Sequence, residues 1–252
     1  MIKFFVEPEA VIGANIYIEK AEDIRHLTKV LRAKKGDAVC ISDGAGWEYE
    51  TEIAEIGEGS VVLKISDKQK AAREPGTRVT LYQGIPKAAK METIIQKNVE
   101  MGVDTIVPVF MERTVVVDKG QFGKKLSRWQ KISDEAVKQC KRSVIPQVRE
   151  PIGFADMVKE LCEGGSDLVI CPYENEENRT MKDCLREFAS SEEKLSQPRI
   201  AVIIGPEGGF SDKETEKLCG IGTELVTLGK TILRTETAGL AAIAMIMYEL
   251  EL

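Results

Sequence analysis

Two glycine-bearing turns near the carboxyl terminus, each placed directly after a short apolar run, constrain the fold of this chain more than any other feature. The first run covers residues 199–204 and is rich in β-branched side chains, which is typical of a buried strand. We expect the glycines that follow it to let the backbone turn with positive φ; they are Gly205, Gly208 and Gly209. Ser211 and Glu214 then form a capping box, which predicts that a helix begins directly after the turn. In α/β proteins, a strand, turn and helix of this kind at the carboxyl end of a sheet form a ligand-binding site.

The second turn, around Gly229, follows the apolar run 224–228 and precedes a long apolar segment. The letters Gly229-Lys230-Thr231 match the end of the phosphate-binding loop, but Glu224 stands where that loop has its first glycine. The acidic Glu207 of the first turn also suits a phosphate poorly. The two turns therefore favour a neutral or cationic ligand, such as an adenosine that carries a sulfonium. Tight turns without a ligand, and a nucleotide hydrolase built on residues 229–231, remain alternatives.

Residues 77–252 alternate expected strands with expected helices, which is the pattern of an α/β fold with a parallel sheet. The strands expected before the glycine turns cover residues 78–83, 104–109 and 167–171. The helices expected between them cover residues 86–101, closed by Gly102, and residues 126–142. This half of the chain therefore predicts a parallel sheet with the two glycine turns at one of its edges.

Residues 1–70 are rich in short β-like runs instead. These runs cover residues 38–42, 47–53 and 60–65, and Asp43-Gly44 is a hairpin signal between the first two. Residues 21–33 carry apolar side chains at helical spacing. We therefore expect a small β-barrel with one short helix over residues 1–70, a charged linker over 71–76, and a second domain over 77–252.

Composition excludes several classes of protein. The 252 residues are 43% apolar and 30% charged, and the longest apolar stretch, 240–248, is too short to span a bilayer. The beginning of the chain lacks the features of a signal peptide, so we expect a cytoplasmic protein. Six cysteines without a Cys-x-x-Cys spacing and the single His26 predict reduced thiols and no metal site. The net charge of −6 argues against indiscriminate nucleic-acid binding, although residues 20–35 are locally basic.

The end of the chain, residues 236–250, is apolar nearly all round if it forms a helix. Such a helix must be buried on several faces. A subunit interface would bury it, which predicts a homodimer. A central helix of a monomer is the alternative.

Two segments carry a resemblance to a known family. Ile204-Gly-Pro-Glu-Gly-Gly209 and Leu228-Gly-Lys-Thr-Ile-Leu-Arg-Thr-Glu-Thr-Ala238 resemble the cofactor-binding segments of SPOUT-class RNA methyltransferases. Within that class, the chain is similar to the bacterial family that methylates N3 of a 16S ribosomal RNA uridine, position 1498. Further segments fit this family: His26-Leu-Thr-Lys-Val-Leu-Arg32, Gly36-Asp37, Gln83-Gly-Ile-Pro-Lys87, Lys97-Asn-Val-Glu-Met-Gly102, Glu112-Arg-Thr114, Arg128-Trp-Gln-Lys131 and Gln139-Cys140. One departure is Thr231, where the family usually has arginine.

The resemblance implies S-adenosyl-L-methionine as the cofactor and 16S ribosomal RNA, within the assembled small subunit, as the substrate. It implies a deep trefoil knot in the second domain, a PUA-like barrel in the first, and a homodimer. A non-catalytic adenosine-binding regulator of ribosomal RNA is the alternative function. The cofactor contacts expected from the two turns and their neighbours are Pro172, Gly205, Pro206, Glu207, Gly208, Gly209, Leu228, Gly229, Ile232, Leu233, Thr237 and Ala238.

The chemistry suggests two catalytic candidates. N3 of uracil must lose a proton before it attacks a methyl group, and the negative charge that develops on O2 and O4 needs a cation nearby. Arg234 is our candidate for that cation, with an ion pair to Glu236 or Glu207 as its alternative role. Glu236 or a water molecule would serve as the base. The residues expected to contact RNA are Arg25, His26, Arg32, Lys87, Arg113 and Arg142.

Overall fold

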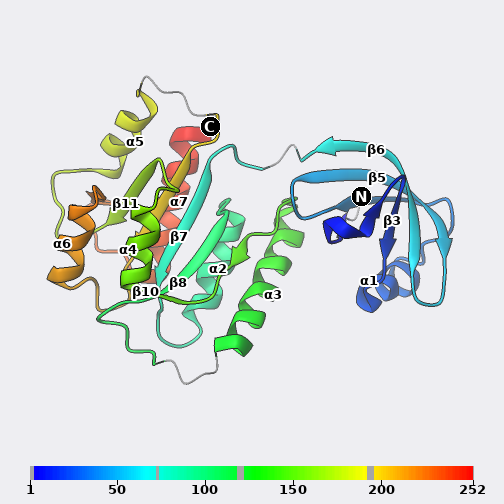
Figure 1. The fold of residues 1–252 in the computed structure, drawn as a ribbon, viewed down its shortest axis with the longest axis horizontal. Helices are drawn as coiled ribbons and strands as arrows, with labels where there is room; N and C mark the ends of the chain where they lie inside the picture. The colour runs from blue at the N-terminus through cyan, green and yellow to red at the C-terminus, as the bar shows by residue number, and fades with distance from the viewer. Residues whose placement is uncertain (1–2, 72–73, 118–121, 192–195, 252) are drawn as a thin grey trace. The chain divides into compact units, whose positions relative to one another are not determined.

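The computed structural model describes residues 3–71, 74–117, 122–191 and 196–251. It divides into two compact units, one formed by residues 1–74 with 137–145 and the other by residues 75–136 with 146–252 (Figure 1). The first unit thus includes a segment from the middle of the sequence.

The first unit is built around a six-stranded sheet with the order β1-β4-β5-β6-β3-β2. Only β1 and β4 run parallel; the remaining pairs are antiparallel. The strands are β1 (Lys3–Phe5), β2 (Val11–Ile12), β3 (Asn15–Ile18), β4 (Ala38–Ser42), β5 (Trp47–Ile56) and β6 (Val61–Lys70), and a 3-10 turn, η1 (Pro8–Ala10), precedes β2. The inward side chains of these strands alternate with exposed ones and form one apolar core, to which Ile41, Ile53 and Leu63 belong.

The helix expected over residues 21–33 is shorter than predicted. Helix α1 (Ala21–Arg25) continues into a single π-helical turn, η2 (His26–Val30), and the helical backbone ends there. Arg32 has a φ of 55°, in the left-handed region, so a regular helix cannot continue to residue 33. The hairpin expected at Asp43-Gly44 is present between β4 and β5, with Gly44 at a φ of 68°.

The segment 137–145 is tied to the first unit by buried polar contacts. Ser143 donates a hydrogen bond to Glu48, and Lys3 donates to both of them. Arg142 pairs with Glu74 at 2.8 Å, and the main-chain N–H of Ser143 donates to the same carboxylate at 2.6 Å. No local pattern in the sequence indicates this insertion, because the contacts join positions about 70 to 140 residues apart.

The second unit contains a seven-stranded sheet in which every pair is parallel. The main order is β10-β8-β7-β12-β11-β13, and β9 pairs with β8. The strands are β7 (Arg78–Gly84), β8 (Thr105–Phe110), β9 (Gln147–Val148), β10 (Ile152–Gly153), β11 (Leu168–Pro172), β12 (Arg199–Ile204) and β13 (Glu224–Val226). The central strands β7 and β12 are apolar and buried, as expected for a sheet covered on both faces.

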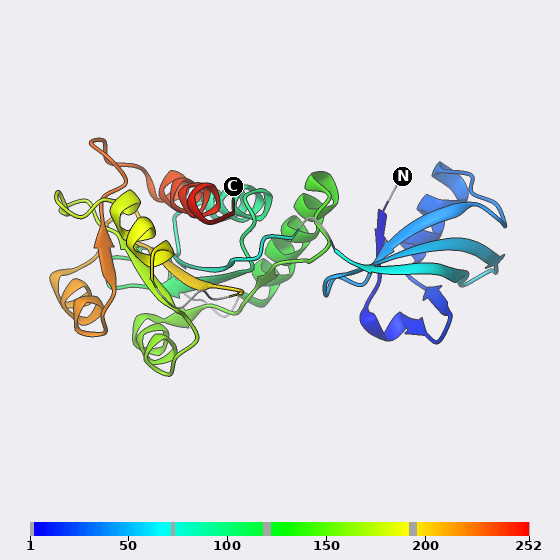
Figure 2. The same cartoon turned by 90° about the horizontal axis from the view of Figure 1, so that it is seen from above.

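Helices cover both faces of this sheet (Figure 2). Those that pack together on one face are α2 (Lys90–Glu100), α5 (Met181–Ala189) and α7 (Thr235–Glu251). The opposite face carries α4 (Phe154–Cys162) and α6 (Asp212–Gly220), which bury an apolar layer with Val107, Ile203 and Leu218. The long helix α3 (Phe122–Cys140) begins in this unit and ends in the first one. The predicted α/β class with a parallel sheet is confirmed.

Several helix boundaries differ from the sequence-based expectation, and α3 begins at Phe122 instead of residue 126. The helix expected from residue 86 begins at Lys90, because Ala88 has a φ of 55° that a regular helix does not allow. The helix expected to end at residue 142 ends at Cys140, and Lys141 takes the left-handed φ of 63°. The expected capping box at Ser211 is present in full, with Glu214 bonded back to the N-cap backbone.

Candidate cofactor pocket

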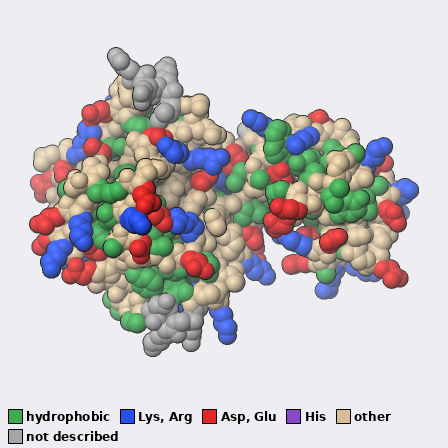
Figure 3. Space-filling view, in the orientation of Figure 1, with side chains coloured by type: hydrophobic (Ala, Val, Ile, Leu, Met, Phe, Trp, Pro, Cys, Tyr) green, Lys and Arg blue, Asp and Glu red, His purple; other side chains and the backbone are tan. Residues whose placement is uncertain are grey.

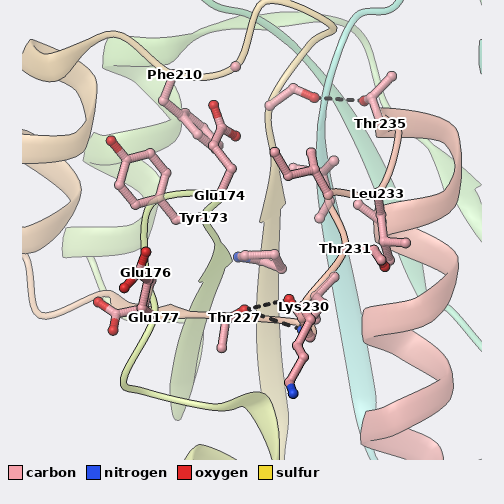
Figure 4. A pocket seen from close by; sticks show the side chains of 18 of the residues that line it. Tyr173, Glu174, Glu176, Glu177, Phe210, Thr227, Lys230, Thr231, Leu233 and Thr235 are labelled. Carbon is pink, nitrogen blue, oxygen red and sulfur yellow. Dashed lines mark hydrogen bonds between the residues drawn. The ribbon is translucent and has the colours of Figure 1, made fainter.

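A cavity of about 650 Å³ opens where the parallel strands β11, β12 and β13 end (Figure 4). Three connections line it: the loop after β11, the glycine turn after β12, and the turn after β13. The first residues of α7 close one side, with Thr235 and Ala238. The carboxyl ends of adjacent strands are where open α/β sheets bind ligands, and the volume is in the range of small-molecule pockets.

The turn after β12 is held in place by hydrogen bonds from other elements. Thr235 donates its hydroxyl to the Gly205 carbonyl at 2.7 Å, and Gln83 at the end of β7 donates to that hydroxyl at 2.8 Å. Arg113 donates to the Gly208 carbonyl at 3.0 Å. The turn is therefore fixed by β7, by the loop after β8 and by α7 at once.

Close approach, more than positive φ, explains the glycines of this turn. Only Gly209 has a positive φ, 66°, so the expectation that Gly205 and Gly208 would share it was wrong. A Cβ at Gly208 would lie 2.9 Å from the Cβ of Arg113, and one at Gly205 would lie 3.1 Å from the ring of Phe210. The missing side chains allow the turn to pack against these neighbours.

Glu207 points toward helix α2 and is not among the residues that line the cavity. Its carboxylate accepts the main-chain N–H of Lys87 at 3.1 Å and pairs with Lys90 at 3.1 Å. Lys90 also pairs with Glu236 at 3.2 Å, and these two partners raise the pKa of its ammonium group. The main-chain N–H of Glu236 lowers the pKa of its own carboxyl group, and Lys90 lowers it further. This cluster fastens the glycine turn to the first turn of α7.

The turn after β13 is anchored at its first residue, because main-chain hydrogen bonds join Thr227 to Arg179 and Met181. The Thr227 hydroxyl accepts from the Gly229 N–H at 3.2 Å and donates to the Gly229 carbonyl at 3.1 Å, so these bonds stay within the turn. Gly229 has a φ of 136°, which requires glycine. Ile232 lines the cavity and is 81% exposed. The departure from the family pattern, Thr231, also lines the cavity.

An acidic rim, formed by Glu174, Glu176 and Glu177 in the loop after β11, was missed by the sequence analysis. Figure 4 shows these carboxylates across the cavity from Lys230 and Thr231. Main-chain N–H groups of Arg179 and Asn178 lower the pKa of Glu176, so this carboxylate is charged at neutral pH. The only sequence signal was the run of acidic residues after the strand that ends at Pro172.

Most of the residues predicted to bind the cofactor line the cavity. Those that line it are Pro172, Gly205, Pro206, Gly209, Leu228, Gly229, Ile232, Leu233 and Ala238. Glu207, Gly208 and Thr237 are not among its lining residues, for Glu207 and Gly208 because of the contacts described above. Residues that line the cavity but were not predicted include Tyr173, Phe210 and Thr235.

The catalytic candidates lie at the edge of the cavity. Arg234 stands between Leu233 and Thr235, which both line it, and its side chain is exposed. In the described part of the chain, neither Glu207 nor Glu236 forms an ion pair with Arg234, since both pair with Lys90. The alternative role considered for Arg234 is therefore not seen.

The residues predicted to contact RNA fall into three groups. Arg25, His26 and Arg32 are exposed on α1, η2 and the residues after them, and the His26 ring packs edge-on against Phe4. Lys87 and Arg113 are exposed in the second unit, beside the glycine turn. Arg142 was a wrong prediction, because its side chain is buried and paired with Glu74.

Comparisons with known proteins agree with this geometry. A family model described as an RNA methyltransferase domain matches residues 73–247, and one described as an RNA methyltransferase PUA domain matches residues 18–66. The chain belongs to this RNA methyltransferase family. Its relatives include ribosomal RNA small subunit methyltransferase E of Bacillus subtilis, 30% identical over 100% of this chain and 98% of that protein. The enzyme of the same name from Buchnera aphidicola subsp. Schizaphis graminum is 34% identical over 96% of this chain and 92% of its own length.

A solved structure of similar fold carries a ligand. The crystal structure of ribosomal RNA small subunit methyltransferase E from Neisseria gonorrhoeae, bound to S-adenosyl methionine, superposes with a TM-score of 0.78. It is 29% identical and covers 98% of this chain and 97% of its own. The similarity spans both units, so the PUA-like unit and the parallel sheet belong together in this family.

Among the described residues, no group of three or more His, Cys, Asp or Glu side chains is arranged to hold a metal ion. No helix in the described ranges is long and apolar enough to cross a membrane.

Proposed function

We propose that this chain is a methyltransferase that uses S-adenosylmethionine to methylate N3 of a uridine in 16S ribosomal RNA. The observation that carries the proposal is the acidic cavity formed by main-chain turns at the ends of β11, β12 and β13, in a chain of this family. Relatives named ribosomal RNA small subunit methyltransferase E support the choice of substrate. The position 1498 and the N3 atom rest on the family resemblance.

The cavity suits a ligand with a neutral nucleoside and a cationic tail. Main-chain groups of residues 204–206 and 228–233 can serve an adenosine, because few side-chain donors stand in these turns. Three carboxylates, Glu174, Glu176 and Glu177, face one lysine, Lys230. The sulfonium and the amino group of S-adenosylmethionine are both positively charged, so this acidic rim attracts them. The same rim repels the phosphates of ATP. Bound S-adenosylmethionine would supply the methyl group as a sulfonium.

The nucleotide hydrolase considered from the sequence fits less well. A phosphate-binding loop presents its Gly-Lys-Thr residues at the start of a helix. Here Thr231 is exposed and α7 begins only at Thr235. Titration calorimetry with S-adenosylmethionine and with ATP tests this directly, and tighter binding of ATP would favour the hydrolase.

Arg234 remains our candidate for stabilising the charge that develops on the uracil oxygens. Arg234 is exposed next to residues that line the cavity, and among the described residues it forms no salt bridge with Glu207 or Glu236, although its charge lowers the pKa of the Glu236 carboxyl group. Glu236 is a poor base, because its pKa is lowered and Lys90 holds its carboxylate. A water molecule is therefore favoured as the base, and Glu236 acts by fixing the first turn of α7.

RNA capture is assigned to the exposed basic residues of both units. Arg25, Arg32 and Lys87 would contact phosphates, with His26 and Arg113 near them in their respective units. Binding of 16S ribosomal RNA should then weaken steeply as salt is raised. Salt-independent binding would contradict the assignment.

A homodimer is part of the proposal. Helix α7 buries one side against the sheet, α2 and α5, but Met245 and Tyr248 remain 37% and 70% exposed. Ile232, beside the cavity, is exposed as well. A second copy would cover such large apolar side chains, which solvent does not favour. The deep trefoil knot stays a prediction of the resemblance, and the cytoplasm, where ribosomal RNA is modified, is the expected compartment.

The deciding experiment is methyl transfer from labelled S-adenosylmethionine to 16S ribosomal RNA, followed by mass mapping of the modified nucleoside. Methyl incorporation at uridine N3 supports the proposal. Cofactor binding without transfer, both to deproteinised RNA and to assembled small subunits, would favour the non-catalytic regulator. The position of the pocket is tested by Gly209→Ala against Gly222→Ala. Both glycines have positive φ, so both variants carry similar backbone strain, but only Gly209 lines the cavity. A Cβ there would also lie 2.8 Å from the Glu174 carboxylate, which lines the cavity, whereas one at Gly222 would meet open space.

A further inference from the structure

A second groove, of about 510 Å³, lies in the first unit, and Arg25, His26 and Arg32 are not among its lining residues. It is lined by Phe5 and Val6 at the end of β1, by Ile12 of β2, and by Tyr17 and Ile18 of β3. Strands β1 and β2 are the two ends of the sheet order. The sheet therefore curls until its two edges face each other across this groove, and it does not close there.

An open seam of this kind leaves main-chain groups without strand partners. In the described residues, β1 pairs only with β4, and β2 pairs only with β3. Unpaired strand edges bind extended peptide segments, because the added chain completes the ladder of hydrogen bonds. Ile12 is 61% exposed at the seam, so an apolar contact is available there as well. Figure 3 shows one face of this unit, where exposed hydrophobic side chains have acidic neighbours.

The charge around the groove is strongly acidic. Glu7, Glu9, Glu19 and Asp23 line it together with Lys20, which already pairs with Glu7 at 3.3 Å. Burial raises the pKa of the Asp23 carboxyl group, while Lys138, Lys20 and His26 lower it. A further cation beside Asp23 would favour its charged form and be attracted by it. A phosphate backbone would be repelled by the same side chains. The chemistry of the groove thus differs from that of Arg25 and Arg32 in the same unit.

We propose that this seam is a docking groove for an extended, lysine- or arginine-rich protein segment of the ribonucleoprotein substrate. The assignment of the partner to the substrate particle rests on the proposed function; the groove and its charge do not. Aliphatic side chains of the segment contact Ile12 and the apolar floor, and its cationic side chains pair with Glu9, Glu19 and Asp23. The first unit then binds RNA through its basic residues and a basic protein segment through its acidic groove. This arrangement favours assembled subunits over naked RNA.

The test uses the full chain with exposed residues only, so that folding is preserved. The groove variant is Ile12→Ser/Glu9→Gln/Glu19→Gln. The matched control is Ile56→Ser/Glu55→Gln/Glu58→Gln, which removes the same side chains at exposed positions outside the groove. Two probes are measured by fluorescence anisotropy: a labelled twelve-residue peptide of alternating lysine and valine, and a labelled single-stranded RNA of twelve nucleotides.

We expect the peptide to bind the wild-type protein and the control alike, and the groove variant about 10-fold more weakly. RNA binding should be unchanged or slightly tighter in the groove variant, because negative charge has been removed. In methylation assays, the KM for assembled small subunits should rise about 5- to 10-fold, while the KM for deproteinised 16S ribosomal RNA stays constant.

The outcomes separate the two proposals. If the peptide binds all three proteins equally or not at all, the docking groove is refuted. If RNA binding falls in the groove variant, the seam takes RNA and the proposal is also overturned. If the wild-type protein methylates neither substrate, the proposed function fails, while the peptide measurement still decides the groove.

Discussion

The turn after β12 and the turn after β13 face the same cavity, and each contains a glycine with positive φ, Gly209 and Gly229. The first is fastened from outside, by Thr235, Arg113 and Lys90. The second is anchored at its start, where main-chain hydrogen bonds join Thr227 to Arg179 and Met181. Beyond this anchor, the Thr227 hydroxyl bonds locally to Gly229, and Ile232 is largely exposed. The two turns thus have similar sequence features but different support. The turn after β12 is fixed by several other elements, whereas the turn after β13 is weakly supported.

This difference indicates a division of roles. The fixed turn can present its main-chain groups to a ligand without any rearrangement, which reduces the entropy lost on binding. The other turn carries the exposed Arg234 and Ile232, whose environment depends on what covers them. We therefore expect changes in the first turn to affect cofactor affinity, and changes in the second to affect chemistry and association.

The largest effect is expected for Arg234→Ala. If Arg234 stabilises the developing charge, methyl transfer should fall on the order of 100-fold or more, while S-adenosylmethionine binds almost normally. Single-turnover transfer and titration calorimetry measure the two quantities. Lys230→Ala is the control, because it removes a cation from the same turn. Loss of folding and cofactor binding together in Arg234→Ala would make this residue structural.

Ile232→Asp tests whether the weakly supported turn is completed by a second copy. Burying a carboxylate in an apolar interface should weaken association about 30-fold or more. Light scattering at micromolar concentration should report about twice 27.9 kDa for the wild-type protein and a lower mass for the variant. Val115→Asp, at another exposed apolar position, should leave the mass unchanged. If the wild-type protein is a fully active monomer, a second copy does not cover the exposed apolar side chains, and the prediction is wrong.

Thr235→Val compares the two turns directly with Thr227→Val. The first change leaves the Gly205 carbonyl without its donor and removes one of the two acceptors of the buried Gln83 amide, so cofactor affinity should fall about 10-fold. The Thr227 hydroxyl bonds only to Gly229 of its own turn, and the main-chain bonds of Thr227 to Arg179 and Met181 do not need it, so its change should have a smaller effect. Thr235→Ser keeps the hydroxyl and should restore binding. Equal losses of cofactor affinity in Thr235→Val and Thr227→Val would mean that the two turns are equally fixed.

The smallest effect is expected for Lys87→Ala. The main-chain N–H of Lys87 still holds Glu207 in this variant, so the fixed turn and cofactor affinity should be unchanged. Only the exposed ammonium group is lost, and RNA affinity should fall about threefold, with a salt slope shallower by about one. Measurements of RNA binding at several salt concentrations test this. An unaltered salt slope would remove Lys87 from the RNA surface.

Local features of the fold could be predicted from the sequence, whereas contacts between distant segments could not. The capping box at Ser211 and the strand ending at Ile204 follow from short-range patterns and are present. The helix expected from residue 86 starts late, because the left-handed backbone at Ala88 has no signal in an alanine. The acidic rim was missed because no local sequence pattern shows that the loop after β11 lies beside the glycine turns.

The roles of the candidate site residues also depended on contacts between distant segments, which the sequence does not show. Arg142 matches a family motif, but its pairing with Glu74 depends on a contact 68 residues away in the chain. Glu207 lies in the predicted turn, yet Lys90 and Lys87 draw its carboxylate away from the cavity. Sequence motifs identified the turns, while tertiary contacts decided which side chains face the ligand.

The insertion of residues 137–145 into the first unit means that this unit is not a transferable module. The chain passes between the units three times, after residues 74, 136 and 145. A fragment cut near residue 75 would lack Ser143 and Arg142, and would leave Lys3 and Glu74 without those partners. Gene fusion or domain exchange at this point would therefore produce an incomplete barrel, and the two units are expected to be inherited together.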